Sequence, residues 1–120
     1  MAEFEIQPST QSARGKPVQV LRLAGQLDAH TFPVLQRELE AIARRDEPRV
    51  VLDCEGLEYV SSAGLGVLKK MTRDFRTKQG DLRLARLPEK IDNVMNLLGF
   101  SQVLRVFGGL DEAVASYAEA

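Results

Sequence analysis

Apolar and polar positions alternate in two ways along this chain, and the two periods divide it into strands and helices. At the N-terminus Phe4 and Ile6 alternate with polar neighbours, which is the two-residue period of a half-buried strand. A polar stretch, 8–16, separates this run from the apolar and β-branched run 18–25. The two runs predict an antiparallel hairpin whose first member is a short edge strand.

Later segments place their apolar residues every three or four positions, as amphipathic helices do. The first begins near Thr31 and is closed off by Pro48, and the second runs from Ser61 and Ser62 to Gly80. The helical stripes are Phe32, Leu35, Leu39 and Ile42; then Leu65, Leu68, Met71 or Thr72, and Phe75; then Ile91, Val94, Met95 and Leu98; and finally Leu110, Ala113, Val114 and Tyr117.

Short apolar runs between these helices fit buried strands, namely 50–52, the run that begins with Leu82 and Leu84, and 103–107. Strands that alternate with helices require right-handed crossovers and therefore a largely parallel sheet. The predicted fold is α/β: a mixed, mostly parallel sheet with an N-terminal antiparallel hairpin and about four helices. A single domain is expected to span residues 1–120, because 120 residues leave no room for a second core.

Composition narrows the function classes. Sixteen Lys and Arg stand against seventeen Asp and Glu, so a net charge of -1 gives no basic field for direct nucleic-acid binding. One cysteine, Cys54, excludes an intramolecular disulfide, and one histidine, His30, excludes an ordinary Cys/His metal cluster. The first residues lack the pattern of a signal peptide, and no apolar run approaches the roughly 18–20 residues of a membrane span. A cytoplasmic protein without a membrane span is expected.

The loop after the second predicted strand contains Asp28 and His30. The Asp28 carboxylate suits a cap for the following helix, and it could instead be presented to a partner. His30 titrates near neutrality, but no nucleophile or orienting acid is apparent for it, so an exposed loop histidine is the simpler interpretation.

The loop 55–64 places Ser61 and Ser62 where a helix needs a side-chain oxygen for its first N–H groups. The Gly-x-Ser-x-Gly turn of the hydrolases is absent around both serines. Gly64-Leu65-Gly66 lacks the third glycine of a dinucleotide fingerprint, and Lys69 with Lys70 does not complete a Walker loop. We therefore expect neither an enzyme nor a bound cofactor, and Cys54 is expected to pack as a small hydrophobe.

One segment carries a recognisable pattern. The chain reads Val51-Leu52-Asp53 and then, after a short loop, Tyr59-Val60-Ser61-Ser62-Ala63-Gly64-Leu65-Gly66-Val67-Leu68. This resembles the STAS family (sulphate transporter and anti-sigma factor antagonist), in which a strand ending in Asp is followed by Asp-Ser-Ser-Gly-Leu-Gly at a helix start. The segments 25–28 and 109–113 are similar to the family's Gly-x-Leu-Asp turn and final helix entry. Two positions depart from the pattern, with Ser61 in place of Asp and Ala63 in place of Ser.

The resemblance implies a free-standing bacterial anti-sigma factor antagonist. Its partner would be an anti-sigma serine kinase of the histidine-kinase-like ATPase fold, with a serine phosphatase for reactivation. Ser62 corresponds to the phosphoacceptor, and the partner would be bound through Asp28, Ser61, Ser62, Ala63, Gly64 and Leu65. A different class stays open, because STAS-like modules also act as constitutive adaptors of an ATPase or transporter complex without phosphorylation.

Overall fold

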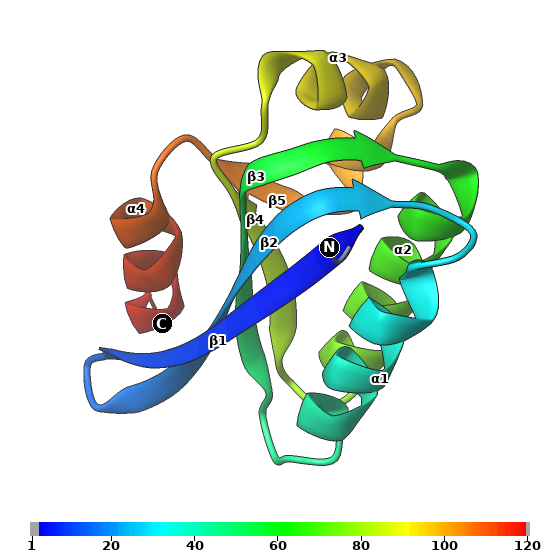
Figure 1. Cartoon of the computed structure of the whole chain (residues 1–120). Helices are drawn as coiled ribbons and strands as arrows, with labels where there is room; N and C mark the ends of the chain where they lie inside the picture. Colours follow the sequence, from blue (N-terminus) through cyan, green and yellow to red (C-terminus); the bar gives the residue numbers. More distant parts are fainter. Residues whose placement is uncertain (1–2, 120) are drawn as a thin grey trace.

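Within residues 3–119, five strands form one sheet in the order β1-β2-β3-β4-β5 (Figure 1). The computed structural model describes residues 3–119. The strands are β1 (Phe4–Ala13), β2 (Lys16–Leu27), β3 (Arg49–Val60), β4 (Asp81–Ala85) and β5 (Arg105–Phe107). β1 pairs antiparallel with β2, and the other neighbours are parallel, which confirms the mixed, mostly parallel sheet with an N-terminal hairpin.

The helices lie on both sides of this sheet. They are α1 (Phe32–Ala43), α2 (Ser62–Arg76), α3 (Glu89–Leu97) and α4 (Leu110–Ala115), with 3-10 turns η1 (Phe100–Gln102) and η2 (Ser116–Ala118). α1 and α2 lie side by side on one face and α4 covers the other (Figure 1). α3, at the top of Figure 1, contributes Ile91 and Met95 to the same hydrophobic cluster as α1 and α2. Among the helices of residues 3–119, none is long and apolar enough to cross a membrane.

Each face of the sheet has its own hydrophobic cluster, because successive side chains of a strand point to opposite faces. In β3, Val50 and Leu52 belong to the larger cluster under α1 and α2, whereas Val51 belongs to the smaller cluster under α4. α1 and α2 contribute Leu35, Leu39, Phe75 and other buried residues to the larger cluster. The amphipathic stripes of α1 and α2 therefore face the sheet as expected, whereas Val94 and Leu98 of the stripe predicted for α3 remain exposed.

β1 is longer than the predicted short edge strand. It continues from the apolar start through the polar residues to Ala13 and pairs with β2 along its whole length, for example Pro8 with Leu21. The turn that joins the two strands is tight, with positive φ at Arg14 (50°) and Gly15 (81°). Strand pairing uses backbone groups only. The side chains of 8–13 are mostly polar and exposed, so the pattern of apolar residues did not indicate a strand there.

β3 is also longer, since it includes most of the segment predicted as a loop and leaves only Ser61 between strand and helix. The pairing with β2 passes two register shifts and ends with Leu27 opposite Val60. At one shift Gly56 lies so close to β2 that a Cβ would be 2.9 Å from the Leu23 carbonyl oxygen. Bulges of this kind interrupt the apolar pattern of a strand without ending it.

The helix ends and the last strand also differ from their predicted bounds. α1 ends at Ala43, well before Pro48, and α4 ends at Ala115, where a 3-10 turn continues. β5 begins only at Arg105, because Val103 and Leu104 belong to the turn after η1, where both of their backbone N–H groups donate to the Phe100 carbonyl. The spacing of apolar residues in a sequence locates the ends of a helix less well than its interior.

Candidate functional site

The loops that follow β2 and β3 lie next to each other at the carboxyl ends of these parallel strands. Leu27 and Val60 are the last paired residues, and the Ser61 backbone N–H donates to the Leu27 carbonyl at 2.8 Å. The Asp28 turn and the start of α2 are therefore adjacent, as expected of loops at the carboxyl edge of a parallel sheet.

Asp28 closes the turn that leads into α1. Its Oδ1 accepts the backbone N–H groups of His30 at 2.9 Å and Thr31 at 3.1 Å, and its carbonyl accepts the Phe32 N–H at 2.9 Å. The His30 bond is the main cause that lowers the pKa of Asp28 below its usual value. The carboxylate thus stabilises the turn before the helix, while Thr31, the N-cap residue, makes no side-chain cap. His30 is exposed, as the sequence indicated.

Ser61 and Ser62 occupy different positions at the start of α2. Ser61 is the N-cap residue with extended backbone (φ -86°, ψ 172°), and its Oγ accepts the Gly64 backbone N–H at 3.2 Å. The predicted capping role is therefore confirmed for Ser61. Ser62 is the first helical residue and is exposed, and no hydrogen bond engages its hydroxyl within residues 3–119.

The next residues of the motif turn toward the core. Gly64 is buried against β2, where a Cβ would lie 2.8 Å from the Leu27 Cγ and 3.0 Å from the Leu27 carbonyl oxygen. Leu65 is 6% exposed, and Ala63 is half-buried. Of the six residues expected to contact a partner, Ser62 is thus the most open, and Gly64 serves the packing of α2 on β2.

A cavity of about 240 Å³ lies beside this helix start and was not anticipated from the sequence. It is lined by Glu58, Tyr59, Val60, Leu65, Lys90, Ile91, Val94 and Met95. Its rim includes large apolar side chains that remain in solvent, with Tyr59 51% and Val94 45% exposed. One feature of the sequence indicates such a surface. Val94 and Leu97 in α3, and Leu98 directly after it, are apolar although they do not belong to the buried face of the helix.

Cys54 does not belong to a reactive centre. Its side chain is buried, and burial raises the pKa of its thiol to about 12. A thiol that stays protonated is a poor nucleophile, so the expected structural role of Cys54 is consistent with its surroundings.

These features have counterparts among known proteins. The STAS domain family matches residues 9–113, which include most of the hairpin, the two adjacent loops and the helices α1 to α3. The chain belongs to the STAS family. Within that family, "Putative anti-sigma factor antagonist BtrV" of Bordetella bronchiseptica is 34% identical over 98 residues, which cover 82% of this chain and 84% of that protein.

Solved STAS structures share the fold. An anti-sigma factor antagonist from Mycobacterium paratuberculosis superposes with a TM-score of 0.79 at 21% identity, covering 96% of each chain. The Bacillus cell fate determinant SpoIIAA in its phosphorylated form superposes with a TM-score of 0.70 at 17% identity, covering 94% of this chain and 99% of that one. The STAS architecture expected from the sequence is therefore confirmed.

Proposed function

We propose that this STAS domain is an anti-sigma factor antagonist of the bacterial cytoplasm that is controlled by phosphorylation of Ser62. In the unmodified state it binds an anti-sigma factor serine kinase of the histidine-kinase-like ATPase fold, which then releases its sigma factor. Phosphorylation of Ser62 by that kinase ends the binding, and a serine phosphatase restores it. The 34% identical relative, named for the antagonist function, and the fold shared with SpoIIAA support the class.

The observation that carries the proposal is the different use of two neighbouring serines. The Ser61 hydroxyl is engaged as the cap of α2, whereas the Ser62 hydroxyl is exposed at the first helical position beside the Asp28 turn. A kinase needs an accessible hydroxyl that the fold does not use. Ser62 meets that requirement, and modification of Ser61 would remove a cap.

The start of α2 can also accommodate a phosphate group on Ser62. A phosphoserine adds about -1.5 to -2 charges, and the positive end of the helix dipole favours anions there. The first turn of α2 contains no acidic residue that would repel the phosphate. Phosphorylation therefore leaves the fold intact, and its effect arises where new charge and bulk meet a partner surface matched to a neutral hydroxyl.

The two departures from the family pattern are compatible with this switch. Serine and aspartate are comparably strong N-caps, so Ser61 preserves the cap that the family's Asp would make, without its charge. Ala63 is half-buried, whereas Ser62 beside it is exposed, so the acceptor hydroxyl is accessible with alanine at position 63. The remaining surface also suits a protein partner, because the cavity lined by Leu65 of the first turn of α2 has the exposed apolar side chains of Tyr59 and Val94 on its rim.

The proposal can be tested by capture of partners from the source cells on Ser62→Ala and Ser62→Asp baits. We expect a serine kinase to bind the Ser62→Ala bait and not the Ser62→Asp bait. Ser9→Asp is the matched control, since Ser9 is exposed on β1, and it should capture the kinase as the unmodified protein does. Incubation of that kinase and ATP with the unmodified protein should then place a phosphate on Ser62, identified by mass spectrometry.

Other outcomes would decide against the switch. Capture of the same ATPase or transporter subunit on both Ser62 baits would identify a constitutive adaptor. ATP hydrolysis by the pure domain, lost in Ser62→Ala, would identify an enzyme and contradict the assignment of Ser62 as a substrate residue.

A further inference from the structure

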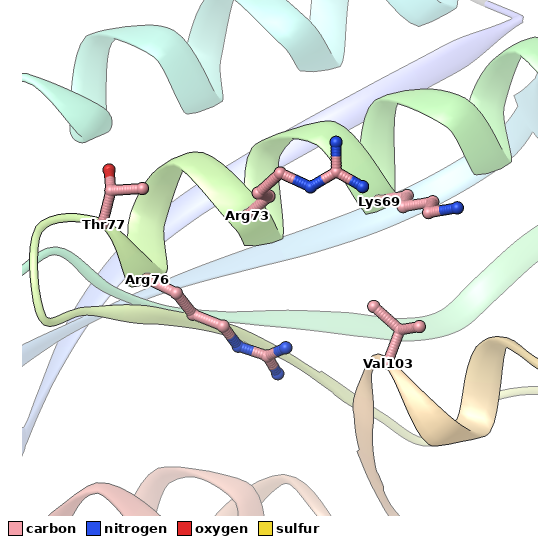
Figure 2. A pocket seen from close by; sticks show the side chains of 5 residues that line it. All are labelled: Lys69, Arg73, Arg76, Thr77 and Val103. Carbon is pink, nitrogen blue, oxygen red and sulfur yellow. The ribbon is translucent and has the colours of Figure 1, made fainter.

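A groove lined by basic side chains runs between α2 and the segment that joins η1 to β5 (Figure 2). Its first part has a volume of about 330 Å³ and is lined by Lys69, Arg73, Arg76, Thr77 and Val103. A second hollow of about 420 Å³ shares Arg76 and Val103 with the first and continues along 101–107. Figure 2 shows Lys69, Arg73 and Arg76 projecting from α2, with Val103 on the opposite wall.

The positive charge of this groove is only partly balanced. Among the described residues 3–119, none that lines either hollow is acidic. Arg76 contacts Asp81 at 2.9 Å, but within the same part of the chain no carboxylate lies within ion-pair distance of Lys69 or Arg73. Lys69 and Arg73 are also one turn apart on the helix, where like charges repel. A protein of net charge -1 thus carries a local positive surface that its own residues do not neutralise.

The groove lies on the same side of α2 as the proposed phosphoacceptor Ser62. Ser62, Gly66, Lys69, Arg73 and Arg76 follow one another at spacings of three and four residues, so they lie along one stripe of α2. Lys69 lies about 10 Å along the helix from Ser62, at about 1.5 Å per residue. Gly66, between them, is exposed and has open space above its Cα, so it leaves the path along the helix unobstructed.

We propose that this groove binds an acidic segment of the protein partner that covers Ser62. The partner's identity rests on the proposed function, whereas the affinity of the groove for an acidic peptide does not. The acidic segment would align the partner along α2 and accelerate its association, as complementary charges do at interfaces. Lys69 and Arg73 are the principal contacts, because Arg76 is shared with Asp81.

The geometry favours an acidic peptide over other anions. Lys69, Arg73 and Arg76 are exposed, so the groove offers no buried donor that would hold a single phosphate or a nucleotide tightly. These three cations form a line along α2, and Arg105 of the second hollow is paired with Glu119 at 3.8 Å, so the unpaired charge does not form a broad face. The net charge of -1 also opposes binding of a long polyanion. An extended acidic segment instead makes several weak contacts at once.

The test is an NMR titration of the full chain with a peptide of about six residues rich in Glu and Asp, which spans the roughly 10 Å between Lys69 and Arg76 when extended. We expect amide shifts confined to residues 66–77 and Val103, and an affinity that falls as salt is raised. Lys69→Glu/Arg73→Glu should weaken binding about tenfold or more. Lys69→Gln/Arg73→Gln, which removes charge without adding repulsion, should give an intermediate loss.

The matched control is Arg37→Glu/Arg45→Glu, an equal charge change at exposed positions on α1 and in the turn after it, which should leave peptide binding unchanged. Equal affinity of the charge-reversed and unmodified proteins, or shifts elsewhere on the surface, would overturn the proposal. Inorganic phosphate that saturates the same amides as tightly as the peptide would indicate a small-anion site instead. Tighter binding of a short DNA duplex would indicate a nucleic-acid surface.

A second arm separates this inference from the proposed function. The captured kinase should bind Lys69→Glu/Arg73→Glu more slowly and more weakly than the unmodified protein, with Ser62 intact in both. A kinase that is released by Ser62→Asp yet binds the charge-reversed protein normally would overturn the groove and leave the phosphorylation switch standing.

Discussion

Arg86 donates two parallel hydrogen bonds to the buried carboxylate of Asp53. Arg86 Nε lies 3.0 Å from Asp53 Oδ1, and Arg86 Nη2 lies 2.6 Å from Oδ2. Asp53 is the aspartate that ends the apolar run 50–52, and its side chain has no exposed surface. Burial alone would raise the pKa of Asp53, but the hydrogen bonds from Arg86 and the Glu55 N–H hold that pKa below its usual value. The ion pair joins the centre of β3 to the end of β4.

The first prediction concerns the pH dependence of this pair. Because folding lowers the pKa of Asp53, its stabilising contribution is complete above the unfolded pKa of about 4 and is lost as pH falls through the folded value. Asp53→Asn should lower the free energy of unfolding at pH 7 by about 1–3 kcal/mol. Urea unfolding at about pH 7 and about pH 3 should show a smaller loss on acidification in the variant than in the unmodified protein.

Asp46→Asn provides the control for the pair, because Asp46 is an exposed residue of the turn after α1. It should change the unfolding free energy by less than about 0.5 kcal/mol. Identical losses on acidification in Asp53→Asn and the unmodified protein would contradict a lowered folded-state pKa for Asp53.

The second prediction compares two glycines of α2. Gly64→Ala forces a Cβ to within 3.0 Å of the Leu27 carbonyl oxygen, so the helix must move away from β2. We expect a loss of about 1–3 kcal/mol in the free energy of unfolding. Gly66→Ala meets nothing within 4 Å and should gain about 0.5–1 kcal/mol, because alanine is the better helix former. Denaturant midpoints that move in the same direction for both variants would contradict this packing.

The contrast between these glycines shows what the sequence could and could not predict. The helices, the parallel strands and the hairpin follow from apolar periods, which report burial directly. The sequence placed Gly64 and Gly66 in one motif, but only the register of α2 on β2 shows that one is packed and the other open. The sequence likewise places both Ser61 and Ser62 where a helix cap is needed, and only the structure assigns the cap to Ser61.

Most of the features that the sequence did not predict depend on contacts between distant segments of the chain. The polar strand β1 depends on backbone pairing with β2, and the cavity beside the start of α2 is formed jointly by β3, α2 and α3. The partner of Asp53 is Arg86, 33 residues away, which no local pattern connects to it. The basic groove also needed the structure, because only the fold places 101–107 against the charged stripe of α2.

The third prediction concerns Tyr117, whose hydroxyl contacts the backbone of β3 and β4. The oxygen lies 2.7 Å from the carbonyl oxygens of Val50 and Asp81, and it accepts the Val50 N–H at 3.3 Å. Tyr117→Phe removes these bonds from a buried site and should cost about 1–2 kcal/mol of unfolding free energy. Tyr59→Phe, at a residue that is half exposed, should cost less than about 0.5 kcal/mol. Equal thermal midpoints for the two variants would show that the Tyr117 hydroxyl contributes nothing measurable.

The last prediction distinguishes the adjacent serines by stability alone, without any partner. Ser61→Ala removes the oxygen that accepts the Gly64 N–H, so the free energy of unfolding should fall by about 0.5–2 kcal/mol. Ser62→Glu adds a carboxylate to a helix start that has none, and stability should stay equal or rise by up to about 1 kcal/mol. Urea unfolding at low ionic strength gives both values, and added salt should reduce the Ser62→Glu gain without restoring Ser61→Ala. A Ser62→Glu protein that unfolds more easily than Ser61→Ala would mean that charge at this position damages the fold, and loss of partner binding could then no longer be assigned to the interface.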